Sequence, residues 1–127
     1  MRKVVDTGLF KVNAPLELAA ISNGTLYVCT IPTRADGTVE TGGFSAQVEL
    51  TLLNLKQAVE AAGATMDDVV QVQVFLTSGK YLAAMNAVYA KFFREPYPVR
   101  ATLITGLIVP GADIEILAHA DVSHVVR

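Results

Sequence analysis

The residue types that could do chemistry in this sequence begin with Arg100. It follows Pro98 and Val99 and opens one of the most apolar stretches of the 127-residue chain. A guanidinium group cannot shed its charge, so placing it beside a hydrophobic core is costly unless an anion meets it. The residues alone leave two interpretations open: an arginine that reaches solvent at the start of a strand, or an anchor for a carboxylate or phosphate.

Glu115 is the second candidate, because it stands between Ile114 and Ile116 in a segment with the pattern of a strand. Side chains alternate between the two faces of a strand, so Glu115 is predicted to point away from both isoleucines, toward the face of His119. Three interpretations of Glu115 stay open. It is a solvated carboxylate or the partner of an arginine, or it orients water near Arg100 if the two strands are neighbours.

The remaining reactive side chains do not belong to any recognisable catalytic or metal-binding motif. Cys29 is the only cysteine, so the chain cannot form an internal disulfide. A cysteine on a strand is more often a small buried hydrophobic residue than a nucleophile, and spacing alone places no base beside it. His119 and His124 lack metal-ligand spacing and are interpreted as surface residues near the C-terminus. The sequence also lacks the glycine-rich loops that bind nucleotides.

Composition argues against two classes of partner and for another. Ten basic and 12 acidic residues give a formal net charge of −2, which argues against a nucleic acid or an anionic membrane as partner. Apolar residues make up 52 % of the chain and charged residues 17 %. A single small domain still exposes roughly a third of its chain surface, so this apolar surplus predicts a buried interface in a homo-oligomer.

The sequence shows no targeting or membrane segment. Its longest uncharged stretch, residues 101–112, is too short to span a bilayer and contains Gly106 and Pro110. Charged residues and Gly8 interrupt the start of the chain, which argues against a signal peptide. With a single cysteine, these features predict a cytoplasmic protein.

Hydrophobic periodicity predicts the elements that would position Arg100 and Glu115. Asn23 and Gly24 favour a two-residue hairpin turn between strands at residues 18–22 and 25–29. Apolar residues at helical spacing predict a helix over residues 44–62 that stops at Gly63, and Ser78 is positioned to cap a second helix that runs to Glu95. Further strands are predicted at residues 70–76, 99–108 and 114–120, with a short extra one near Val4.

This order of elements predicts an α+β fold with one sheet and two helices. Two helices can cover only one face of such a sheet, whereas the strands look apolar on both faces. We therefore expect another copy of the same chain to cover the second face.

The segment Pro98-Val99-Arg100, followed by Ile114-Glu115-Ile116, resembles the signature of the YjgF/RidA family. Residues 53–63 and 85–93 also resemble the two helices of that family. The resemblance covers nearly the whole chain, so we expect residues 1–127 to form a single RidA-like domain.

The resemblance implies a chorismate-mutase-like α+β fold, assembled as a homotrimer with a central barrel and three clefts between subunits. Well-known members hydrolyse reactive 2-imino and 2-enamino acids to 2-keto acids and ammonia, without a metal or organic cofactor. Arg100 matches the family arginine that binds the substrate carboxylate, and Glu115 matches the glutamate that helps hold the attacking water. Asn86 matches a helix asparagine found near the cleft.

Four pocket residues differ from those of the family deaminases. Leu16 stands in place of a tyrosine, Val28 and Cys29 replace a Ser-Gly pair, and Thr102 replaces a cysteine. The matches place Leu16, Cys29 and Thr102 in the substrate cleft, whose more apolar wall predicts a preference for imines with apolar side chains. Two alternatives stay open: a non-catalytic small-ligand-binding or stress-type trimer, and a deaminase of a ring-cleavage product such as 2-aminomuconate.

Overall fold

A hairpin turn at Asn23 and Gly24 begins the sheet, as the sequence predicts. Both residues have positive φ, 51° and 73°, in the computed structural model, which describes residues 1–126. The turn joins β2 (Ala19–Ser22) to β3 (Thr25–Thr30), and the short β1 (Lys3–Val4) pairs with the outer edge of β2.

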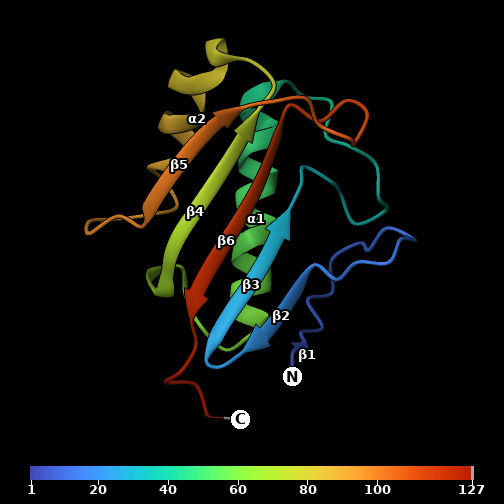
Figure 1. Cartoon of the computed structure of the whole chain (residues 1–127). Coiled ribbons are helices and arrows are strands. Elements are labelled where there is room, and N and C mark those ends of the chain that lie inside the picture. Colours follow the sequence, from blue (N-terminus) through green and yellow to red (C-terminus); the bar gives the residue numbers. More distant parts are fainter. Residues whose placement is uncertain (127) are drawn as a thin grey trace.

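The sheet has six strands in the order β1-β2-β3-β6-β4-β5 (Figure 1). The later strands are β4 (Val69–Leu76), β5 (Val99–Ile104) and β6 (Ile114–Asp121). β4 and β5 run parallel, and every other neighbouring pair is antiparallel. The last strand in the sequence therefore lies in the middle of the sheet, and β5 forms one edge.

Helix α1 (Phe44–Ala61) matches its prediction closely. Its stripe of Val48, Leu52, Leu55 and Val59 is fully buried against the sheet. Gly63 ends the helix with a φ of 84°, a conformation that glycine adopts without steric cost.

Helix α2 (Leu82–Tyr89) is shorter than predicted. Ser78 caps a preceding 3-10 turn (Gly79–Tyr81), in which its Oγ accepts a hydrogen bond from the Lys80 N–H at 3.3 Å. After Tyr89 the chain tightens into three-residue turns, so the prediction of a helix up to Glu95 is wrong. These turns bury Phe93, whose ring centre lies 4.6 Å from that of Tyr89, and this packing outweighs continuation of the helix.

The strand predicted over residues 99–108 ends at Ile104. Its only partner is β4, which ends at Leu76 opposite Ile104. One further hydrogen bond, from the Thr105 N–H to the Leu76 carbonyl at 2.9 Å, closes the ladder. Within residues 1–126, residues 106–108 have no neighbouring strand to pair with, so a scarcity of polar residues does not by itself extend β5.

Both helices pack on the same face of the sheet (Figure 1), which confirms the predicted α+β arrangement. The core lies between them and the sheet, and β6 contributes its alternate residues Ile114, Ile116, Ala118 and Ala120. No helix within the described part of the chain covers the opposite face, which is called the open face below. None of the helices within residues 1–126 is long and apolar enough to cross a membrane.

Candidate functional site

Arg100 projects from β5 toward the helices. Its register partner on β4 is Val72, whose side chain is fully buried under them. The guanidinium carbon lies 4.8 Å from the centre of the Tyr89 ring, and Nη1 lies 3.9 Å from the sulfur of Met85. The interaction with the ring stabilises a cation but does not neutralise it.

Arg100 forms no ion pair with any carboxylate in residues 1–126. Arg34 offers a contrast, because its Nη2 lies 2.8 Å from Oε2 of Glu40. Arg100 is only partly exposed, yet its charge has no counter-ion among residues 1–126. This arrangement leaves N–H donors along the edge of the planar guanidinium free for an anion.

The unpaired arginine lines a cleft of about 320 Å³ together with Asn86, Tyr89 and Tyr97. The predicted anchor Arg100 and the predicted cleft residue Asn86 are therefore brought together. The hydroxyl of Tyr89 is buried and has no hydrogen-bond partner within the described residues. Burial raises the pKa of Tyr89 to about 12, so the hydroxyl stays neutral at physiological pH.

Thr102 lies further along β5 on the same face as Arg100. It pairs with Val74 of β4, which is also buried beneath the helices. Its side chain is exposed and does not line the cleft around Arg100. Within one copy of the chain, Thr102 is thus a neighbour of the cleft on the edge strand.

Glu115 projects from β6 onto the open face, as alternation predicts. Its one side-chain hydrogen bond within residues 1–126 comes from Cys29 of β3, whose Sγ donates to Oε2 of Glu115 at 3.5 Å. Burial, reinforced by the nearby Glu115 carboxylate, raises the pKa of Cys29 to about 12. The thiol is therefore protonated at neutral pH, and its nucleophilic form, the thiolate, is scarce.

Leu16 and Cys29 line a second cleft of about 490 Å³ on the open face. Tyr27 and Leu117 add apolar surface to it, and Arg2, Lys11 and Glu17 add charged groups. Val28 also borders this cleft, but its side chain is 2 % exposed and belongs to the core. The expected replacement of a polar group by Val28 therefore changes the core more than the cleft surface.

Arg100 and Glu115 do not meet within one copy of the chain. The hypothesis that they approach each other requires β5 and β6 to be neighbours, but β4 lies between these strands. The two side chains also project from opposite faces, since Arg100 aligns with buried Val72 and Glu115 aligns with Phe75. The predicted site residues thus form two half-sites on opposite faces of the sheet.

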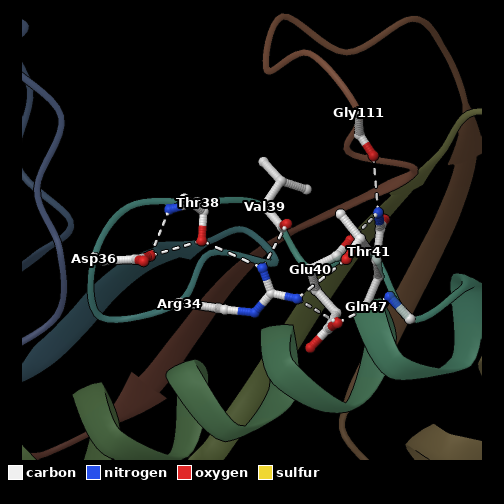
Figure 2. Close-up of polar contacts among 9 residues, drawn as sticks. Arg34, Asp36, Thr38, Val39, Glu40, Thr41, Gln47 and Gly111 are labelled. Atoms are coloured by element: carbon white, nitrogen blue, oxygen red, sulfur yellow. Dashed lines mark hydrogen bonds and ion pairs between the residues drawn. The ribbon is translucent and has the colours of Figure 1, made fainter.

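Gln47 holds the backbone just before β6, at Asp113, two residues before Glu115. Its Nε2 donates hydrogen bonds to the carbonyls of Glu40 at 3.0 Å and Gly111 at 2.8 Å, and its Oε1 accepts one from the Asp113 N–H at 2.8 Å. Figure 2 shows the amide side chain reaching from α1 to Gly111. Sequence reasoning missed this residue, although a glutamine three positions after Phe44 on the buried stripe of a helix signals such a role.

The loop before α1 is also held by polar contacts (Figure 2). Arg34 binds Glu40 and donates to the Val39 carbonyl at 3.1 Å, while Asp36 accepts hydrogen bonds from Thr38. The N–H of Gly42, together with Arg34, lowers the pKa of Glu40. This ordered loop follows β3 and joins the Gln47 network through the Glu40 carbonyl.

The two histidines lie outside both half-sites. His119 meets the Tyr27 ring edge-to-face, with 4.8 Å between ring centres, and Nε2 of His124 lies 3.5 Å from Asp68. No group of three histidine, cysteine or acidic side chains within residues 1–126 is arranged to hold a metal ion.

A family comparison supports the resemblance seen at Arg100 and Glu115. The sequence model described as Endoribonuclease L-PSP matches residues 9–122, a span that includes both residues. The chain belongs to this family. The matched structures include proteins of the Rid family, so the predicted YjgF/RidA relationship is confirmed.

Solved structures of this family superpose over nearly the entire chain. A Thermotoga maritima protein proposed to be an endoribonuclease is 31 % identical, with a TM-score of 0.89 over 95 % of this chain and 98 % of its own. The Rid-family protein YyfA from Yersinia pestis is 27 % identical, with a TM-score of 0.90 over 96 % and 100 %. E. coli TdcF with bound serine is 26 % identical, with a TM-score of 0.85 over 94 % and 98 %.

Proposed function

We propose that this chain is a single RidA-like domain, over residues 1–127, that hydrolyses 2-imino and 2-enamino acids to 2-keto acids and ammonia. The observation that carries the proposal is Arg100, a partly buried guanidinium in a cleft with no carboxylate partner in residues 1–126. A guanidinium presents paired N–H donors that match the two oxygens of a carboxylate. The free thiol of Cys29 fits the reducing cytoplasm as the compartment.

The complete site forms between copies of the chain in a homotrimer. β5 is an edge strand that carries one half-site, while the open face carries the other. The open face also exposes Val99 and Leu103, by 68 % and 42 %, so contact with another copy would bury apolar surface. One copy supplies Arg100, Asn86 and Thr102, and the neighbouring copy supplies Leu16, Cys29 and Glu115.

In this site the chemistry needs little beyond positioning. Arg100 holds the substrate carboxylate, and the iminium carbon next to it is already electrophilic. Water adds to that carbon while Glu115 accepts its proton, and the resulting amino alcohol releases ammonia to leave a 2-keto acid. An enamine is first protonated at carbon. No metal or organic cofactor takes part in this scheme.

The non-catalytic alternative, a small-ligand-binding trimer, is favoured by one feature of the open-face cleft. Leu16 has no hydroxyl, so this cleft offers one polar group fewer than a family deaminase. A serine-bound structure of TdcF supports an amino-acid-like ligand under either function. Binding without turnover would distinguish the binder from the enzyme.

Ammonia release from imines generated by an amino-acid oxidase tests the proposal. The wild-type protein should accelerate release, and Arg100→Ala should abolish the acceleration while the protein still assembles. Arg94→Ala is the matched control, because Arg94 is 79 % exposed and pairs with Asp67 away from both half-sites. Full activity of Arg100→Ala would refute the assigned role, and binding of 2-imino or 2-keto acids without any turnover would favour the binder.

A further inference from the structure

The carboxylate of Glu115 has one hydrogen-bond donor among the side chains of residues 1–126, and that donor is Cys29. The thiol sulfur lies 3.5 Å from Oε2 of Glu115. No side chain of residues 1–126 donates a hydrogen bond to Oε1 of Glu115. Glu115 also forms no ion pair with any of these residues. The two oxygens of this carboxylate are therefore in different environments.

We propose that Cys29 is a positioning residue, whose thiol holds one oxygen of Glu115 and leaves the other directed at the attacking water. This inference rests on the proposed hydrolase function, because it assigns a task to the carboxylate of that reaction. It gives Cys29 a role that is neither that of a nucleophile nor that of a passive part of the cleft wall.

The strand register explains why a side chain at position 29 reaches Glu115. β3 and β6 are antiparallel neighbours, and Cys29 stands directly opposite Leu117. Glu115 lies two residues along β6 on the same face, a diagonal distance that side chains on paired strands can bridge. Both partners stand on paired strands, so the geometry is held by the backbone.

The state of the thiol suits this role. A thiol can donate a hydrogen bond only while it is protonated. Burial and the neighbouring carboxylate both favour the protonated form of Cys29, so the donor is present throughout the physiological pH range. An ionised thiol would instead repel Glu115.

The pairing itself can be tested without reference to catalysis. Cys29 is the only cysteine, so the S–H stretching band in an infrared spectrum arises from this residue alone. The band lies at lower frequency when the thiol donates a hydrogen bond. We expect a shift to higher frequency in Glu115→Ala, and no shift in Thr25→Ala, which alters the same strand at its far end. An unchanged band in Glu115→Ala would overturn the pairing.

Kinetics on generated imines then test the positioning role. Cys29→Ala should lower kcat roughly tenfold, because a misplaced water reacts slowly, while KM changes less than about twofold because Arg100 still anchors the substrate. Cys29→Ser restores a donor and should recover part of kcat, which a purely structural role would not predict. Thr25→Ala should keep wild-type kinetics.

Two outcomes separate this inference from the function on which it rests. An unchanged kcat in Cys29→Ala, with active wild-type protein, would overturn the role of Cys29 and leave the hydrolase proposal intact. A wild-type protein that binds 2-keto acids but hydrolyses no imine would overturn the hydrolase proposal, and the catalytic role of Cys29 with it.

Discussion

The guanidinium carbon of Arg100 lies 4.8 Å from the centre of the Tyr89 ring. Helix α2 thus supplies an aromatic platform for the cation on the edge strand β5. The ring stabilises the guanidinium charge but is not an anion that would neutralise it. The hydroxyl of Tyr89 is buried and has no hydrogen-bond partner in the described residues. Ring and hydroxyl therefore contribute differently to the site.

Tyr89→Phe should separate these two contributions. Phenylalanine keeps the ring beneath Arg100 and removes a buried hydroxyl that has no partner, so the free energy of unfolding should stay unchanged or rise by up to about 1 kcal/mol. Tyr89→Leu removes the ring and should lower it by about 2 kcal/mol. Urea unfolding measures both. Equal destabilisation by the two substitutions would contradict this account.

Gln47→Leu should destabilise the protein by about 2–4 kcal/mol. The substitution leaves the Gly111 carbonyl and the Asp113 N–H without their amide partner, at a site that is partly buried. Gln57→Leu serves as a graded control, because exposed Gln57 makes a single hydrogen bond to the Thr7 carbonyl. The Gln57→Leu substitution should lower the free energy of unfolding by less than about 1 kcal/mol. Chemical denaturation that ranks the two variants equally would show that the Gln47 network adds little.

The raised pKa of Cys29 predicts a loss of stability in alkali. Cys29 has a folded-state pKa of about 12 against an ordinary value of 9.0. Below about pH 9 the thiol is protonated in both states, so its contribution is complete. Above that pH the unfolded chain ionises first, and unfolding becomes more favourable up to about pH 12.

The difference in unfolding free energy between wild type and Cys29→Ser isolates this effect, because the tyrosines titrate in both proteins. The wild type should lose about 2 kcal/mol relative to the variant between pH 7 and about pH 10.5. A difference that does not vary with pH would show that the thiol ionises as readily in the folded as in the unfolded protein.

Leu103→Glu should dissociate the proposed trimer. Leu103 is 42 % exposed on the open face of a single copy, so the charge costs little in a monomer but must be desolvated in an interface. Leu53→Glu is the matched control, because Leu53 is 47 % exposed on α1, which faces outward in the proposed assembly. Sedimentation velocity reports the state of each protein. A wild-type monomer at micromolar concentration would contradict the trimer outright.

Leu16→Tyr should change which imines are hydrolysed. Leu16 contributes apolar surface to the open-face cleft, so kcat/KM should be higher for leucine- or methionine-derived imines than for 2-aminoacrylate. A tyrosine there adds a hydroxyl and should raise turnover of 2-aminoacrylate. A clear wild-type preference for 2-aminoacrylate would refute the apolar-cleft interpretation.

Local patterns in the sequence were sufficient to identify the main helices and strands and the facing of their side chains, but not to place the ends of α2 and β5. Asn23 and Gly24 specify their turn through positive φ, and the helical spacing from Val48 to Val59 specifies the buried face of α1. Alternation also placed Glu115 correctly on the face opposite Ile114 and Ile116. These features depend on residues close in sequence, where backbone geometry links spacing directly to direction.

Only the tertiary structure decided which of these side chains meet. The insertion of β6 between β3 and β4 separates Glu115 from Arg100 and brings it to Cys29, 86 positions earlier in the sequence. Gln47 likewise reaches Asp113 across a separation of 66 positions. Strand order and helix docking arise from burial of apolar surface shared by the whole chain, so the spacing around any one residue does not encode them.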